Sequence, residues 1–130
     1  MMSDKLEIER EIREAFNTCF RFESQKKVCN LGESKHEFDV YEEEKLIGGI
    51  NTSSWRNKSG TNNTGGQDRV CTELLRLTLW NGNEKRVLIL TDCEMFEKFL
   101  KRFKGINFSK PIEVYLYSIE KKSFVNSQTL

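Results

Sequence analysis

A run of six residues, 86–91 (RVLILT), constrains the fold of this chain more than any other segment. Its central residues 87–90 are all apolar, and turn-forming residues stand on both sides of the run. A strand with this pattern has both of its faces buried, so other elements must cover the sheet on each side. The run therefore predicts an α/β domain with this strand in the middle of the sheet.

Other segments predict helices and strands around this run. Apolar residues at helical spacing predict three helices. The first begins after Ser3 and ends at about residue 24, and the others span 67–80 and 92–104. Short apolar or alternating runs predict strands at 28–31, 37–41, 45–52 and 112–119, with 37–41 and 45–52 joined as a hairpin. Residues 53–66 (SSWRNKSGTNNTGG) have no apolar period, which predicts a flexible loop.

The length and composition indicate one folded domain. The chain has 130 residues, of which 37% are hydrophobic and 32% charged, which is too apolar for a disordered chain. We expect a single domain over 1–120 and a frayed polar tail over 121–130. No apolar run approaches the ~20 residues that cross a bilayer, so we expect a cytoplasmic protein without membrane contact.

Charge and cysteine usage limit the kinds of partner. Residues 1–50 carry 12 acidic and 8 basic side chains, whereas residues 51–130 carry 8 and 13, which permits an anionic partner such as DNA or RNA on one side. A protein partner or a homodimer is equally compatible with this composition. The four cysteines have no metal-ligand spacing, and His36 alone cannot complete a zinc site.

The expected order of elements is helix, three strands, helix, strand, helix and strand. This order resembles the core of the restriction-endonuclease-like, or PD-(D/E)XK, nuclease superfamily over nearly the whole chain. The resemblance implies an Asp on the second strand and Glu-x-Lys on the third, which together hold Mg²⁺ and the attacking water. Here HEFDVY supplies Asp39, while Gly49 and Asn51 of LIGGINTSS stand where the Glu and Lys would be.

The motif is therefore degenerate in its chemistry. Alternate residues on a strand share a face, so residues 49 and 51 are expected to project together toward the strand that carries Asp39. Glycine offers no carboxylate and asparagine carries no charge, whereas Mg²⁺ sites use one or two carboxylates. Asp39 is then a surviving catalytic and metal residue, or an ordinary solvent-facing residue of a hairpin strand.

The resemblance also offers a relocated site. Some members of the superfamily supply the second acid from the helix after the third strand, where Glu73 lies, and an additional acid from the first helix, where Glu11 lies. The alternatives are an ion pair on the helix surface for Glu73 and a solvated side chain for Glu11. The missing lysine would then be replaced by Lys45, Arg56 or Lys58.

A nucleic-acid surface is the second candidate site. Trp55, Arg56 and Lys58 offer a stacking ring and two cations in one loop, which suits a phosphate backbone and unpaired bases. The resemblance places Gln67 and Arg69 near phosphate. Trp55 could equally fold back as a lid over the core. The basic residues near the end of the third helix form a further cationic surface, most simply matched to the helix dipole: Lys98, Lys101, Arg102 and Lys104.

Three functions follow in order of preference. The first is a nuclease-fold protein that has lost metal-dependent cleavage and binds nucleic acid or a protein partner, with no cofactor. The second is an active Mg²⁺-dependent endonuclease that uses Asp39 with Glu73 and Glu11. The third is an unrelated small α/β interaction module.

Overall fold

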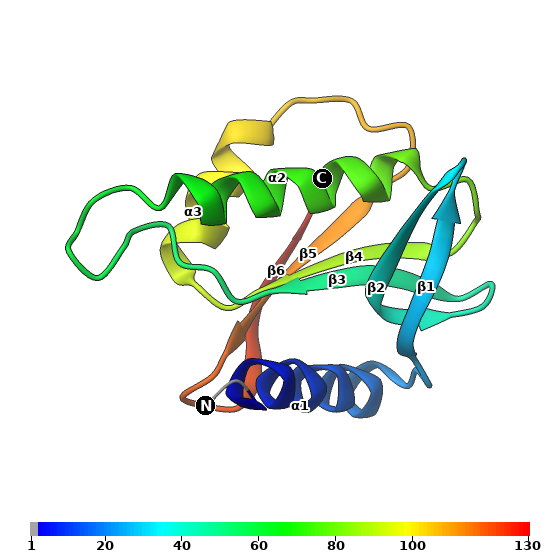
Figure 1. Ribbon diagram of the computed structural model, residues 1–130, viewed down its shortest axis with the longest axis horizontal. Helices are drawn as coiled ribbons and strands as arrows, with labels where there is room; N and C mark the ends of the chain where they lie inside the picture. The colour runs from blue at the N-terminus through cyan, green and yellow to red at the C-terminus, as the bar shows by residue number, and fades with distance from the viewer. Residues whose placement is uncertain (1–2) are drawn as a thin grey trace.

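Six strands form one mixed sheet in which the spatial order equals the chain order, β1-β2-β3-β4-β5-β6 (Figure 1). The computed structural model describes residues 3–130. The helices are α1 (Ser3–Phe20), α2 (Thr64–Leu79) and α3 (Cys93–Phe103). The strands are β1 (Gln25–Leu31), β2 (Ser34–Glu42), β3 (Leu46–Asn51), β4 (Lys85–Leu90), β5 (Ile112–Ser118) and β6 (Ser123–Thr129). The expected order of elements is confirmed, and β6 is added to it.

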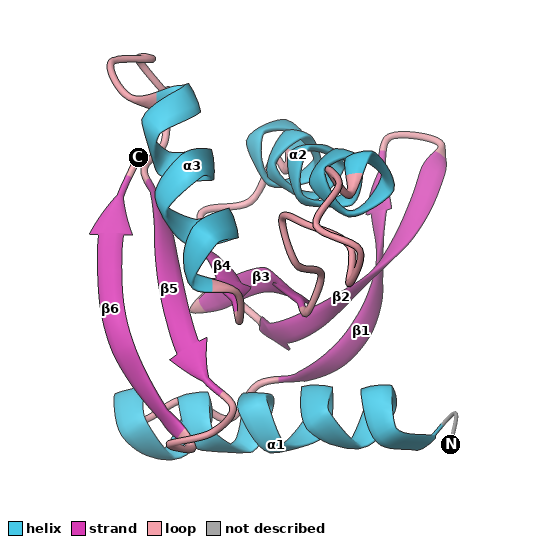
Figure 2. Ribbon diagram, turned by 90° about the vertical axis from the view of Figure 1, so that its left-hand side faces the viewer, coloured by secondary structure: helices cyan, strands magenta, loops and turns pink. Residues whose placement is uncertain are grey.

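The helices divide unequally between the two faces of the sheet. β3, β4 and β5 are parallel, whereas the pairs β1–β2, β2–β3 and β5–β6 are antiparallel. The crossovers through α2 and α3 step along the sheet in the same direction, and crossovers of one hand place both helices on the same face. α1 covers the opposite face (Figures 1 and 2).

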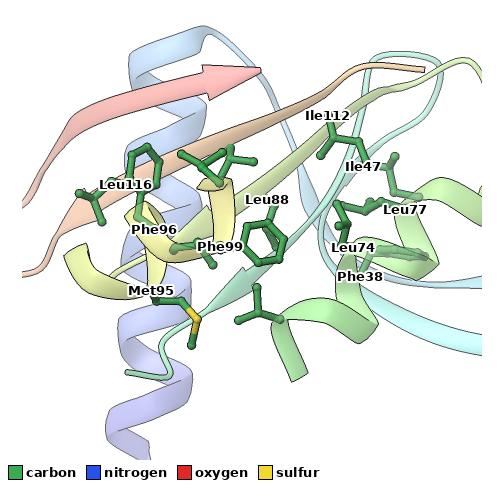
Figure 3. Close-up of a cluster of buried hydrophobic side chains, with 14 of the residues drawn as sticks. Phe38, Ile47, Leu74, Leu77, Leu88, Met95, Phe96, Phe99, Ile112 and Leu116 are labelled. Carbon is green, nitrogen blue, oxygen red and sulfur yellow. The ribbon is translucent and has the colours of Figure 1, made fainter. Parts of the chain in front are cut away.

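The prediction that residues 86–91 form an interior strand is confirmed. β4 lies between β3 and β5, and its residues from Arg86 onward are buried. Val87 and Ile89 pack in the α1 core, while Leu88 and Leu90 pack in the core under α2 and α3. Figure 3 shows the second core, where side chains from both helices converge on β3, β4 and β5.

The predicted hairpin of β2 and β3 is also confirmed, but its strands separate early. The ladder runs only from Glu42↔Leu46 to Val40↔Gly48. On its other side, β2 has one residue more than β1 between matching pairs, which is a bulge. Phe38 consequently faces the core under α2, and Val40 faces α1. Asp39 lies between them, at the point where β2 leaves β3.

Helix α1 ends four residues earlier than expected. Arg21 adopts a left-handed backbone with φ of 64°, and the Phe22 N–H donates to the Asn17 carbonyl at 3.0 Å. The Asn17 side chain also binds the backbone of Ser24 in both directions. This local capping stops the helix and releases the chain into β1.

The loop expected to be flexible is built from internal hydrogen bonds. Arg56 and Asn62 form an isolated bridge, and the N–H of Asn57 donates to the Thr61 carbonyl at 2.7 Å. Asn63 then caps α2, its side chain accepting from the Gly66 N–H. Polar side chains that show no apolar period thus hold a hairpin, and α2 begins three residues before the predicted start.

The expected tail 121–130 is corrected by the structure, because Ser123–Thr129 form strand β6. β6 is an edge strand, so its side chains stay mostly exposed and carry no hydrophobic period. Phe124 holds it in place by packing against Tyr115 and Tyr117 of β5 and Phe16 of α1. Within residues 3–130, no helix is long and apolar enough to cross a membrane.

Candidate functional site

The candidate site lies where β2 and β3 separate, between α1 and α2. The Asp39 carboxylate accepts the Ile50 N–H at 2.7 Å. Beyond Val40↔Gly48 the β2–β3 ladder has stopped, so this side chain supplies an acceptor to the main chain of β3. Asp39 therefore has a structural task in addition to any catalytic one.

The electrostatic environment of Asp39 is unusual. Burial raises the pKa of Asp39 to about 6, against the lowering effect of the Ile50 hydrogen bond. The carboxylates of Glu9 and Glu73 raise it further, and Lys26 opposes them. A partly buried carboxyl whose pKa is raised by burial and by two other acids is the kind of group found at functional sites.

The side chain of Glu73 occupies the position that a residue-49 side chain would take. A Cβ built on Gly49 would lie 2.3 Å from Glu73 Oε1 and 2.6 Å from Glu73 Cγ. Glu73 is correspondingly buried, at 9% exposure. An acid from α2 thus fills the space next to residue 49 of β3, and glycine at position 49 leaves room for it.

Two neighbours hold Glu73 there. His36 Nε2 lies 3.1 Å from Oε2 and 3.3 Å from Oε1, and Arg76 Nη1 lies 3.9 Å from Oε2. The His36 ring packs edge-on against Phe38, which fixes its orientation. Glu73 therefore keeps the ion pair with Arg76 along its helix, but it is buried and not on the surface, and His36 is its nearer partner.

A recess opens beside Glu73 with a volume of about 400 Å³. Arg69 and Arg76 bring two guanidinium groups to it, and Arg69 also donates to the Ser53 hydroxyl at 3.3 Å. Asn51 has turned its carbonyl oxygen to the Ser53 N–H at 2.8 Å. The lining residues are Ile50, Asn51, Asp68, Arg69, Thr72, Glu73 and Arg76.

Helix α1 turns Glu9, and not Glu11, toward Asp39. Glu9 is buried at 7% exposure, whereas Glu11 is exposed and its carboxylate acts on Tyr117, whose pKa is raised mainly by burial. Glu9 precedes Ile12 by three residues and Phe16 by seven, so it lies on the buried stripe. That spacing was the available sequence signal.

None of the expected lysine replacements lies beside Asp39. Lys45 pairs with Glu42 at the start of β3, and Arg56 pairs with Glu94 on α3. Lys26 on β1 lowers the pKa of Asp39 by its charge, and Arg13 of α1 donates to the main-chain carbonyl of Asp39 at 3.3 Å. Sequence reasoning missed Lys26, because strand pairing alone brings residues 26 and 39 together.

Trp55 takes the lid position. Its ring centroid lies 5.6 Å from Lys98 Nζ and 5.4 Å from the Arg102 guanidinium carbon, and the main-chain N–H of Trp55 donates to the Asp92 carboxylate at 3.0 Å. Gln67 donates to the Trp55 carbonyl at 3.0 Å, so it braces the loop from α2. The ring is partly buried and packs against the cations of α3.

The two loop cations differ in their availability. Arg56 Nε donates to both carboxylate oxygens of Glu94, at 3.0 and 3.1 Å, which occupies its charge within the protein. Lys58 stands exposed at the tip of the loop, and within residues 3–130 it has no hydrogen bond or ion pair. Only Lys58 of the two is therefore ready to meet an anionic partner.

No family model, curated protein or solved structure matches this chain. Within the described part of the chain, no group of three or more His, Cys, Asp or Glu side chains is arranged to hold a metal ion. The geometry instead presents a set of acids with internal partners next to a recess that carries two arginines. The two guanidinium groups can bind a phosphate or another small anion, although Asp68 and Glu73 line the same recess with opposite charge.

Proposed function

We propose that this chain is a restriction-endonuclease-like domain that binds nucleic acid and does not cleave it. The observation that carries the proposal is the substitution in space of Glu73 for a residue-49 side chain. A carboxylate from α2 at that place is the relocated acid that some members of the superfamily have, so it supports the fold assignment. The order of elements and the Asp39 position on β2 support the same assignment.

The loss of cleavage is supported by the partners of the two acids. Asp39 accepts the Ile50 N–H, and Glu73 is bonded to His36. Divalent cation binding would have to compete with both interactions. Asn51 supplies no charge in place of the motif lysine, because it is neutral and its carbonyl oxygen is used by Ser53.

Nucleic-acid binding is supported by the cations near this site. Arg69 and Arg76 line the recess, and guanidinium groups bind phosphate oxygens in a bidentate manner. Lys58 projects from the loop that follows β3, the same strand whose end lines the recess. Together these groups would contact the phosphate backbone at several points.

Fluorescence anisotropy with labelled 20-mers, single-stranded and duplex, tests binding. We expect binding at 50 mM salt that weakens at 200 mM, and a salt slope smaller by about 2 in the variant Arg69→Ala/Arg76→Ala. Lys121→Ala/Lys122→Ala removes the same charge from the β5–β6 turn and should bind nearly as the parent does. Absence of parent binding at low salt, or equal slopes in all three proteins, would overturn the proposal.

A plasmid nicking assay tests the absence of cleavage. Supercoiled DNA incubated with the protein and Mn²⁺ should remain supercoiled. Nicking that disappears in Asp39→Ala would show a working catalytic centre, and the non-cleaving assignment would then be wrong.

A second function, an active Mg²⁺-dependent phosphodiesterase, is favoured by the charges of Glu9 and Glu73 that act on Asp39. Burial is the main cause that raises the pKa of Asp39 to about 6, and the charges of Glu9 and Glu73 raise it further. A divalent cation would relieve the repulsion of these two carboxylates. Calorimetric titration with Mn²⁺ tests it. Tight binding that is lost in Asp39→Ala and in Glu73→Ala, but kept in Glu11→Ala, would establish this function in place of the first.

A further inference from the structure

The two edges of the sheet are protected to different degrees. β1 exposes Lys26 and Lys27 and carries a register irregularity, both of which discourage pairing with another strand. β6 has no charged residue and no proline over Ser123–Thr129, and its one irregularity lies near its start, opposite Leu116 and Tyr117. The stretch after that irregularity is an open edge (Figure 2).

The ladder to β5 shows which groups of β6 are free. Ile112 and Leu130 exchange both of their main-chain hydrogen bonds, at 3.2 and 2.8 Å. In an antiparallel pair every second residue repeats this exchange, which assigns the inward bonds to Gln128 and Asn126. Ser127 and Thr129 therefore direct their N–H and C=O groups to the outer edge.

One outward donor already has a local substitute for a partner strand. The Ser127 N–H donates to the side-chain oxygen of the preceding Asn126 at 2.8 Å. A side chain that bonds to the neighbouring main chain in this way competes with strand pairing and yields to it. The Ser127 N–H thus has an acceptor in the free protein, and it can donate instead to a carbonyl of an added strand.

A groove of about 630 Å³ runs between α3 and β6, within the size range of ligand sites. Leu100 and Phe103 of α3, together with Ile106 and Leu130, give it apolar surface, and Ile106 is 52% exposed. Asn126 and Gln128 line the strand side. α3 packs over β5 and leaves this face of β6 uncovered (Figure 2).

Charge around the groove is mostly positive. Lys101 and Lys104 line it from α3, and within residues 3–130 neither has an ion-pair partner. Glu97 is the only acidic side chain that lines it, one turn earlier on the helix. An occupant with carboxylates would therefore meet two cations near the end of α3.

We propose that this edge and groove bind an extended peptide segment that carries apolar and acidic side chains. The segment adds as a strand to β6 through the outward groups of Ser127 and Thr129. Every second side chain of an added strand points to one face, so its apolar residues enter the groove and its carboxylates reach Lys101 and Lys104. This interaction is independent of nucleic-acid binding beside Glu73.

Phage display of random nonapeptides on the immobilised protein provides the probe. We expect enriched sequences in which apolar residues alternate and acidic residues flank them. Synthetic peptides of those sequences, labelled with fluorescein, are then titrated with the protein. Failure to enrich any such sequence overturns the proposal.

Two variants localise the binding. Ser127→Pro removes one outward N–H and keeps the ladder to β5, so the affinity should fall roughly tenfold, as for one hydrogen bond. Lys101→Glu/Lys104→Glu alters only exposed side chains and should weaken acidic peptides by at least as much. Lys121→Glu/Lys122→Glu makes the same charge change outside the groove and should bind as the parent does.

The separation from the nucleic-acid site is also measurable. Arg69→Ala/Arg76→Ala should bind the selected peptides with parent affinity whether or not it binds oligonucleotides. Unchanged peptide binding in both Ser127→Pro and Lys101→Glu/Lys104→Glu would show that the peptides bind elsewhere, and the β6 site would be wrong.

Discussion

Glu73 occupies the space that a side chain at position 49 would fill. Gly49 has no Cβ, so the Glu73 side chain from α2 can place its carboxylate there. Each residue is explained only by the other, because a side chain at 49 would expel Glu73. Gly48 differs, since a Cβ there would meet the Val87 carbonyl oxygen of the main chain.

This pairing predicts non-additive stability. Gly49→Ala should lower the free energy of unfolding by about 1–3 kcal/mol, because the methyl group overlaps Glu73. Truncation in Glu73→Ala removes the overlapping atoms, so Gly49→Ala should cost much less in that background. Urea denaturation of the two single variants and the double variant measures the coupling.

Gly48→Ala is the control for that cycle. Its Cβ would overlap main-chain atoms of β4, which no side-chain truncation can remove. It should stay destabilising in the Glu73→Ala background. Equal costs of Gly49→Ala with and without Glu73 would contradict the shared position.

Asp39 predicts a specific dependence of stability on pH. Its pKa is raised from 3.8 to about 6 in the folded protein, so the folded state holds this proton more tightly than the unfolded state. The contribution is complete below pH 3.8 and is lost as the pH rises through about 6, a difference of about 3 kcal/mol. Asp39→Asn cannot ionise and retains an acceptor for the Ile50 N–H.

Denaturation of wild type and Asp39→Asn at pH 4 and pH 7.5 tests this sign. The advantage of the variant over wild type should grow by about 2–3 kcal/mol between the two pH values. Comparing the proteins with each other cancels the acids whose pKa is lowered, such as Glu42, whose main cause is the hydrogen bond from the Glu23 N–H. An advantage that shrinks as the pH rises would contradict the assignment.

At the scale of elements, the loop between β3 and α2 is fixed at its base and free at its tip. The Trp55 ring lies against two cations of α3, Lys98 and Arg102, and Asp92 both caps α3 and accepts the main-chain N–H of Trp55. The start of α3 and the start of α2 therefore share one anchor. Lys58 lies at the exposed tip of the loop and makes none of the contacts that fix the base of the loop.

Removing the anchor should release the loop. In Trp55→Ala the buried ring and its cation contacts are lost, which is worth about 1–2 kcal/mol of local stability. Trypsin should then cleave after Lys58 roughly tenfold faster, because local opening limits the reaction. Cleavage after Lys121, in the β5–β6 turn, is the internal control and should keep its rate.

At the scale of the whole molecule, β6 completes the α1 core as well as the sheet. Phe124 joins the aromatic group of Phe16, Phe20, Tyr115 and Tyr117. The ring packs against α1, the first element of the chain, although it belongs to the last strand. The two ends of the described chain are thus connected through one cluster of rings.

A chain that stops at Lys121 tests the importance of β6. Loss of Phe124 and of the β5–β6 ladder should cost more than about 3 kcal/mol and expose β5 as a new edge. We expect a lower melting temperature by circular dichroism, together with aggregation. A truncated chain as stable as the parent would restore the view of 121–130 as a tail.

The sequence predicts well where local signals and burial agree. The apolar run of β4 identifies an interior strand, and Asp92 with the aromatic stripe behind it defines α3 closely. Strand β6 is not predicted from the sequence, because an exposed polar edge strand has no hydrophobic period. The ordered structure of the loop between β3 and α2 is not predicted either, because it comes from hydrogen bonds of Asn, Ser and Thr side chains.

The candidate site was predictable in part. The Gly48-Gly49 pair indicates a close approach, and Asp39 follows from its strand. What approaches Gly49 depends on the angle at which α2 crosses β3, which no local pattern encodes. The spacing of three residues between Glu73 and Arg76 predicts an ion pair on the helix surface. In the structure that pair is present, but Glu73 is buried and lies closer to His36.

Because the six strands lie in the sheet in the order in which they occur in the chain, cleavage of the main chain at the exposed loop tip would divide the sheet between β3 and β4. Residues 1–58 would keep α1 and β1–β3, and residues 59–130 would keep α2, α3 and β4–β6. The boundary would contain the six pairs of the β3–β4 ladder, and both hydrophobic cores would also be divided between the fragments. Glu9, His36 and Asp39 would lie in one fragment and Glu73 in the other, so the site would exist only after the fragments reassociate. The domain thus has the layout of a split protein whose activity reports complementation.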